Sequence, residues 1–219
     1  MFKKHVAALL LGASLILGAT NIAYDFEFWS KNVGIGNVFS RLDGGSDNGL
    51  FGDPTLVNGD TFVFFPEAWR AESANGVADS ASDRLEVHLW AKEGFSFSGI
   101  ILHEEGDYGI LGDGAVSVSG SAFAVNTSVF DVVSDDLESN PPSPINGGFG
   151  SWEADAFIEI PNWEHLVLIF DNNLLAISGA NGISFIEKKV VGITFVPEPT
   201  SLLLLGLGSA VVVFSRRRR

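Results

Sequence analysis

The chain has 219 residues, 25 glycines, 18 phenylalanines, no cysteine and a formal net charge of −14. This length suits one domain with short appendages, and 46% hydrophobic residues is too high a share for a disordered chain. The lack of cysteine excludes a disulfide scaffold and a thiolate metal site. Binding to nucleic acid is disfavoured, because the phosphate backbone would be repelled by the negative charge.

The N-terminal segment has the pattern of a secretory signal peptide. Lys3 and Lys4 precede an apolar run over residues 6–17, and small residues follow it. A basic head, an apolar stretch and small residues in this order are typical of such a signal. The run would form a helix of about 18 Å, which is short for a membrane span. Cleavage after Ala19 or after Ala23 fits the pattern, and a buried N-terminal helix is the alternative.

The C-terminal segment combines a short motif, an apolar stretch and a basic tail. Pro197, Glu198 and Pro199 lead into residues 200–215, which carry no charge. That stretch would form a helix of about 24 Å, close to the thickness of a bilayer core. The two prolines cannot lie inside a helix, so we expect a stiff, extended neck just outside the membrane. A membrane stop on the cytoplasmic side is predicted for the four residues that close the chain, Arg216, Arg217, Arg218 and Arg219.

These C-terminal features resemble the PEP-CTERM sorting signal of exported proteins from Gram-negative, exopolysaccharide-producing bacteria. The Pro-Glu-Pro motif, the apolar stretch and the basic tail stand in the same order at the end of the chain. The resemblance implies that an exosortase, a membrane cysteine protease, recognises the motif and cleaves near it. An ordinary tail anchor with an accidental Pro-Glu-Pro sequence is the alternative.

Both termini carry basic residues, which favour the cytoplasmic side of the inner membrane. The part between them is therefore expected to cross that membrane through the secretory translocon, with signal peptidase removing the leader. This divides the chain into a signal peptide (1–23), an extracytoplasmic domain (24–196) and a sorting signal (197–219). The central domain holds 26 acidic and 7 basic side chains, a net charge of −19.

The central domain is predicted to be all-β. Residues 84–92 alternate apolar and polar side chains, as a half-buried strand does. In residues 115–125 the apolar positions change parity around Gly120, which predicts a bulge or bend there. Many short strands between glycine- and proline-rich turns predict an antiparallel, jelly-roll-like β-sandwich. Further strands are expected over residues 24–29, 61–65, 127–133, 152–160, 166–170, 174–178 and 183–195.

Catalytic signatures are weak in this domain. Neighbouring residues of a strand point to opposite faces, so His103, Glu104 and Glu105 cannot converge as a set. The histidines lack the spacing of zinc ligands, and no metal site is assigned. A pair of carboxylates could serve a glycoside hydrolase, but so acidic a composition would produce such pairs by accident. No enzymatic activity is therefore predicted.

Calcium is the one cofactor that the sequence suggests. Asp43, Asp47 and Asp53 lie in a glycine-rich loop, and Ca²⁺ favours flexible loops of oxygen ligands. Their spacing does not match an EF-hand, so a simple surface turn is the alternative.

Trp90 is the candidate for binding carbohydrate. If the apolar residues of 85–91 face the core, Trp90 shares the outer face with Glu86, His88 and Lys92. An aromatic side chain beside polar groups can stack on a sugar ring. The alternative is that a second sheet or a loop covers this face.

The predicted function is that of an exported protein that is tethered to the inner membrane and then sorted to the cell surface or extracellular matrix. The resemblance implies a structural or carbohydrate-associated component of an exopolysaccharide layer, without catalysis. A secreted, glycoside hydrolase-like enzyme with paired carboxylates is the alternative.

Overall fold

The computed structural model describes residues 45–58, 60–91 and 95–199. The predicted signal peptide, the expected strand at 24–29, the apolar stretch 200–215 and the arginine tail lie outside these residues. Within them there are eleven strands and no helix, and hence no helix able to span a membrane. The strands are β1 (Gly45–Ser46), β2 (Thr55–Val57), β3 (Thr61–Phe64), β4 (Arg70–Ala74), β5 (Asp79–Trp90), β6 (Phe95–Asn126), β7 (Asp131–Asp136), β8 (Glu138–Asn140), β9 (Ile145–Trp163), β10 (His165–Ser178) and β11 (Ile183–Pro199).

The predicted alternation of β5 is present. Leu85, Val87 and Leu89 are at most 2% exposed, and the residues between them face outward. Strand β10 joins two of the expected strands into one of 14 residues. The sequence analysis predicted two strands here because Asp171, Asn172 and Asn173 interrupt the apolar run of β10. Two of them face outward, and Asn172 is a polar residue inside the core.

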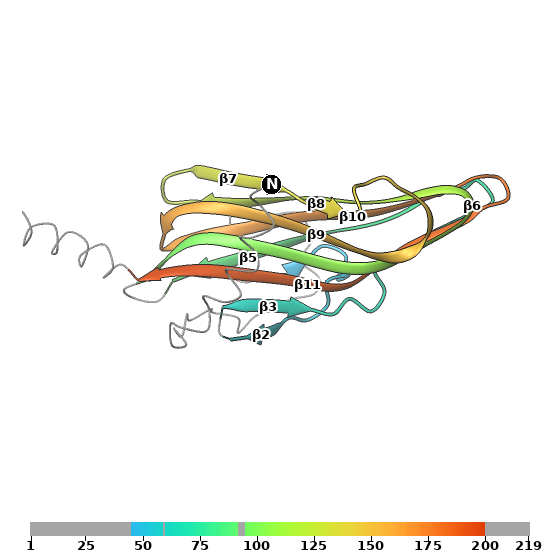
Figure 1. Cartoon of the computed structure of the whole chain (residues 1–219). Helices are drawn as coiled ribbons and strands as arrows, with labels where there is room; N and C mark the ends of the chain where they lie inside the picture. Colours follow the sequence, from blue (N-terminus) through green and yellow to red (C-terminus); the bar gives the residue numbers. More distant parts are fainter. Residues whose placement is uncertain (1–44, 59, 92–94, 200–219) are drawn as a thin grey trace, which may run out of the picture.

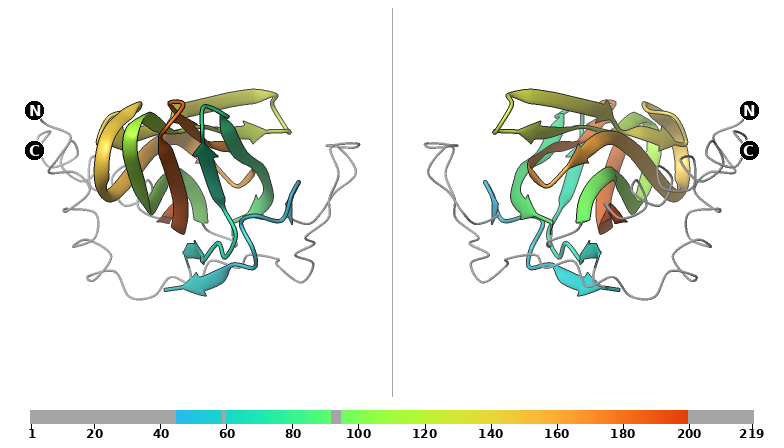
Figure 2. Two further views of the ribbon diagram at one scale, coloured as in Figure 1. Left: turned by 90° about the vertical axis from the view of Figure 1, so that its right-hand side faces the viewer. Right: turned by 90° about the vertical axis from the view of Figure 1, so that its left-hand side faces the viewer.

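All eleven strands belong to one antiparallel sheet that curls over on itself (Figures 1 and 2). Strand β6 makes this possible, because it turns back at Gly112, whose φ is +79°. Its residues 95–111 pair with β9 and β11, and its residues 114–126 pair with β10 and β7. We call the part of the sheet around residues 95–111 the first layer and the part around residues 114–126, with β10 and β5, the second layer. The predicted all-β, antiparallel class is confirmed, and the sheet is continuous.

The core lies between the two layers and is rich in aromatic rings. The Phe51 ring centroid lies 4.7 Å from that of Trp69, 5.5 Å from that of Phe64 and 6.0 Å from that of Phe170. Phe51 lies in a loop and Trp69 in the connection to β4, whereas Phe64 belongs to β3 of the first layer and Phe170 to β10 of the second layer. Burying each of them contributes about 1.5–3 kcal/mol, so the cluster ties the layers together in a chain without disulfides.

The predicted bend at Gly120 is wrong. Strands β6 and β10 keep one register from Gly114 to Val125, with no bulge. The parity of the core positions does not change, because Ala122 and Ala124 continue the inward series while the larger apolar residues there face outward. The glycine serves close packing instead. A Cβ atom at Gly120 would lie 2.7 Å from the Leu137 side chain and 2.8 Å from the carbonyl oxygen of Asp171.

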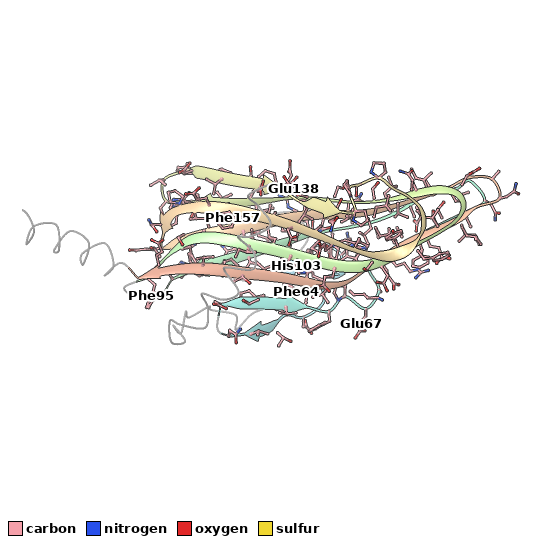
Figure 3. The ribbon with its side chains drawn as sticks, viewed as in Figure 1. Phe64, Glu67, Phe95, His103, Glu138 and Phe157 are labelled. Carbon is pink, nitrogen blue, oxygen red and sulfur yellow. The ribbon has the colours of Figure 1, made fainter. Side chains whose placement is uncertain are left out.

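The long strands give the molecule two distinct ends. At one end β6 turns at Gly112, beside the turn that joins β10 to β11 (Figure 1, right). At the other end β11 finishes at Pro199, paired with Phe95, the first residue of β6 (Figure 3, left). Because β6 turns back at Gly112, its last residue, Asn126, lies at this same end. The start of β10 pairs with this part of β6 and with the end of β5, so Trp90 lies there too. We call it the Pro199 end.

Candidate functional site

A polar groove of about 1000 Å³ crosses the outer face of the second layer. One row of its floor runs across four neighbouring strands. Arg84 of β5 is paired with Asp171 of β10, Asp171 with Ser121 of β6, and Ser121 with Asp136 of β7. Side chains two residues apart on a strand point to the same face. The next row of the floor is therefore formed by Ser82, Asn173 and Ser119.

The floor of the polar groove offers both donors and acceptors of hydrogen bonds. Nε of Arg84 lies 3.5 Å from Oδ1 of Asp171, and the two side chains are 38% and 48% exposed. The Ser121 hydroxyl donates to Oδ1 of Asp136 at 2.6 Å. Hydroxyl, amide, guanidinium and carboxylate groups thus face solvent side by side.

One wall of the groove is the loop after β1, and buried Asp83 holds it in place. The carboxylate of Asp83 accepts hydrogen bonds from the backbone N–H groups of Asn48 and Leu50, at 2.8 and 2.7 Å. The Asn48 amide donates to the carbonyl oxygen of Ser82 at 2.9 Å. Partial burial, and then the nearby Asp83 carboxylate, raise the pKa of Asp47. The wall is therefore anchored by backbone contacts, while Asp47 faces the groove.

The opposite wall is the segment that follows β7. Ser143 fixes it to β6, because its hydroxyl donates to the carbonyl oxygen of Val118 at 3.0 Å and accepts from the Val118 N–H at 3.1 Å. Ser139 donates to the same hydroxyl at 3.1 Å. The groove as a whole is acidic, since its lining holds one arginine and five carboxylates, those of Asp47, Asp83, Asp136, Glu138 and Asp171.

Trp90 lies on the same outer face as the polar groove, six residues along β5 from Arg84, which is about 20 Å. The indole is half-buried and stacks on His165, its cross-strand partner, at 4.7 Å between centroids and 17° between planes. The ring of His88 lies 6.2 Å away. Burial, and then His88, lower the pKa of His165. The outer-face position predicted for Trp90 is present; Lys92 lies outside the described residues, and the contact with a sugar stays a prediction.

A charged cluster that the sequence reasoning missed lies inside the core. Nζ of Lys188 is 2.6 Å from Oε1 of Glu104, and Nδ2 of Asn172 donates to the same oxygen. The ammonium group also lies 4.2 Å from the centroid of the Trp69 ring, a cation–π contact. Burial lowers the pKa of Lys188 to about 8, although Glu104 opposes the shift. The sequence held a signal for this cluster: Glu104 on β6 and Lys188 on β11 are charged residues at inward positions, and these two strands pair directly.

His103 lies on the outer face of the first layer (Figure 3). Its Nδ1 is 2.7 Å from Oδ1 of Asp155 on β9, and its Nε2 is 2.9 Å from Oε1 of Glu105. These hydrogen bonds, that of Asp155 first, raise the pKa of His103 to about 9. Glu104 points into the core, so the three adjacent residues do not converge, as expected. With both ring nitrogens occupied, His103 links β6 to β9.

The aspartates of the suggested calcium loop are divided in the structure. Asp43 lies outside the described residues, Asp47 faces the polar groove and Asp53 is exposed. In the part of the chain that the structure describes, no three histidine, aspartate or glutamate side chains are grouped closely enough to hold a metal ion. Calcium binding by the complete loop stays a prediction.

The Pro-Glu-Pro motif is the last part of β11. Pro197, Glu198 and Pro199 pair with residues 97, 96 and 95 of β6, after a register shift between Val196 and Pro197. The backbone is extended, as expected for the neck, but it is paired with the sheet of the central domain. The functional boundary predicted after residue 196 is therefore not a break in the fold.

Comparison with known proteins bears on the C-terminal segment. The family described as the PEP-CTERM protein-sorting motif matches residues 195–219, so the predicted sorting signal is confirmed. No curated protein matches the sequence.

Two solved structures illustrate how distant the structural matches are. The structure of TmCBM61 in complex with beta-1,4-galactotriose is 8% identical, with 59% of this chain and 68% of that chain covered and a TM-score of 0.19. The enzymatically active domain of bacteriophage CBA120 tailspike protein 4 is 9% identical, with 59% and 20% covered and a TM-score of 0.23. At such TM-scores neither likeness carries an argument.

Proposed function

We propose that this chain, which carries a PEP-CTERM protein-sorting motif at residues 195–219, is an exported protein that an exosortase sorts to the cell surface or extracellular matrix. The observation that carries the proposal is that Pro197, Glu198 and Pro199 end the folded β domain and directly precede a charge-free stretch with an arginine tail. The translocon and signal peptidase act at the N-terminus. The inner membrane then holds the C-terminus until the exosortase cleaves near the motif.

We further propose that the central domain is a non-catalytic, jelly-roll-like module that binds polysaccharide in its polar groove. Hydroxyl, amide and carboxylate side chains there match the donors and acceptors of sugar hydroxyl groups. The groove lies on the outer face of the sheet and is open to solvent, as binding to a polymer chain requires. Trp90 supports the same role, because it extends this face with an aromatic ring.

The charge of the groove indicates which polysaccharide it accepts. Five carboxylates and one guanidinium give this lining a negative charge, so uronic acid or sulfated units are disfavoured, because like charges placed opposite each other in an interface cost several kcal/mol. A neutral glycan is therefore the proposed ligand class.

The alternative of a glycoside hydrolase has one supporting observation. Asp136 and Asp171 lie in one row of the floor, separated by one strand, so their Cα atoms are about 10 Å apart. Inverting enzymes hold two carboxyl groups about 6.5–9.5 Å apart. Here Asp171 faces Arg84 and Asp136 accepts a hydrogen bond from Ser121. These contacts engage both carboxylates, which favours binding over proton transfer.

The test is affinity electrophoresis of the exported product in gels that contain neutral glucans, galactans or a polyuronate. We expect retardation by a neutral polymer and none by the polyuronate. Asn173→Ala, in the groove floor, should weaken binding about tenfold by leaving a sugar hydroxyl unpaired. Ser151→Ala, on the exposed face of the first layer, should bind as the unchanged protein does. Migration unaffected by every polymer would refute glycan binding, and release of reducing ends would favour the hydrolase.

A further inference from the structure

The turn between β6 and β7 carries an apolar tip that folding alone does not explain. Phe130 is 83% exposed and Val129 is 66% exposed. Phe130 also has a φ of +55°, a backbone conformation that bulky side chains disfavour. The other non-glycine residues with positive φ in the described part of the chain are Asn58, Asn75 and Asn162, the residue type that tolerates it. Phe130 is thus both exposed to solvent and held in an unfavourable backbone conformation.

This tip lies at the Pro199 end of the molecule. Asn126 pairs with Asp131 and closes the turn, residues 127–130, directly beyond the last residues of β6. Val125, just before the turn, pairs with Val167 near the start of β10. Strands β10 and β11 pair with the two halves of β6, and the chain reverses between them at residues 179–182. The start of β10 and the end of β11 therefore lie at the same end (Figure 1, left).

The Pro199 end has no spacer between the folded sheet and the predicted anchor. Pro199 is still paired with Phe95, and the charge-free stretch begins at the next residue, 200. While the chain is tethered, this end must therefore face the bilayer surface closely. The turn at residues 127–130 lies at this same end (Figure 1, left).

We infer that Phe130 and Val129 insert into the lipid interface beside the anchor. The tethered domain then contacts the membrane at two places, the predicted anchor and this turn. Apolar and aromatic side chains are favoured at this depth, and the polar Thr127 and Ser128 suit the headgroup region. The domain is acidic and Asp131 lies next to the turn, so anionic lipid would repel it. The membrane surface proposed for this contact is therefore zwitterionic. The inference rests on the proposed tethering through the sorting signal.

This orientation also bears on the proposed glycan contact. The polar groove crosses the side of the molecule, between its two ends. A domain that stands on its Pro199 end would keep this groove open to polymer outside the membrane.

The test uses the full chain in phosphatidylcholine vesicles. Because the chain has no cysteine, a single fluorophore can be attached through Val129→Cys or, as the control, through Phe149→Cys. Phe149 is 69% exposed and pairs with Gly109, toward the opposite end of the sheet. We expect nitroxide-labelled lipid to quench the fluorophore at position 129 and not the one at position 149.

A second change separates lipid contact from folding. Phe130→Asn suits the positive φ, so the melting temperature should stay the same or rise, whereas quenching at position 129 should be lost. Quenching that is absent at 129, or unchanged by Phe130→Asn, while the protein still floats with the vesicles, would overturn this inference alone. Failure to float would overturn the tethering proposal as well.

Discussion

Lys188 and Glu104 form a charged pair inside an apolar core, and each depends on the other. Both side chains have no exposed surface. Burial of an ion is costly, so the pair is maintained by its short contact, by the Asn172 amide and by the indole of Trp69. Such a cluster favours one register between β6 and β11, because any slip would leave a buried charge without its partner.

Removing one member of this pair should destabilise the fold strongly. Glu104→Ala leaves the Lys188 ammonium buried without its counter-charge, and we expect a loss of about 3–5 kcal/mol in the free energy of unfolding. Replacing both residues together, with Glu104→Leu and Lys188→Met, should cost far less, because it also removes the desolvation penalty. Urea denaturation of the three proteins measures both effects. A single change that costs as little as the double one would refute the coupling.

His103 should give stability a dependence on pH. Its pKa is raised to about 9 in the folded state, above the ordinary value of 6.5. The folded state therefore binds the proton more tightly, and the stabilisation is complete below pH 6.5 and is lost as the pH rises through 9. Because the side chain is 38% exposed, solvent screening limits the effect to about 1 kcal/mol or less. The stability difference between the unchanged protein and His103→Gln should shrink from pH 6 to pH 10; a constant difference would contradict this.

At the scale of the elements, two glycines of the first layer provide a matched pair for testing how β6 and β11 pack. A Cβ atom at Gly106 would lie 1.9 Å from the carbonyl oxygen of Glu187 and 2.7 Å from the Trp152 ring. Gly106→Ala must displace β11 and should cost about 3 kcal/mol. At Gly192 the nearest atom would be the carbonyl oxygen of His103 at 3.7 Å, so Gly192→Ala should be tolerated. Equal melting temperatures for the two variants would contradict the packing of these strands.

The strands were the part of the fold that the sequence could predict, because their alternation is local. Leu85, Val87 and Leu89 define an inward face without reference to any other strand. The turn of β6 at Gly112 was missed, since the register with β10 and β11 that requires it is set by residues far along the chain. The wrong bend at Gly120 had the same cause, because nothing local shows that Leu137 packs over that position.

The polar groove could not be predicted for a similar reason. Arg84, Ser121 and Asp171 come from three strands that are distant in sequence, and only the register brings them into one row. Each strand carried a partial signal, since Ser117, Ser119 and Ser121 are polar at every second position. Which positions of different strands meet is decided by the curl of the whole sheet.

At the scale of the whole molecule, the sequence indicated the destination of the chain better than the activity of its domain. The predicted signal peptide and the sorting motif are contiguous segments, so residues 1–23 and 197–219 can be interpreted without knowledge of the fold. The structure adds that the motif, although extended, continues β11 up to Pro199. An exosortase would then meet its substrate with the folded domain close against the membrane, and cleavage would release both contacts proposed here.

The intact mass of the protein recovered outside the cell tests this account most directly. We predict a product that begins after Ala19 or Ala23, ends near Pro197–Pro199 and lacks all four C-terminal arginines. Cells without exosortase should instead keep a membrane-bound form with its C-terminus intact. An external product that retains Arg216–Arg219, or a chain that stays inside the cell with its N-terminal segment uncleaved, would contradict export and sorting.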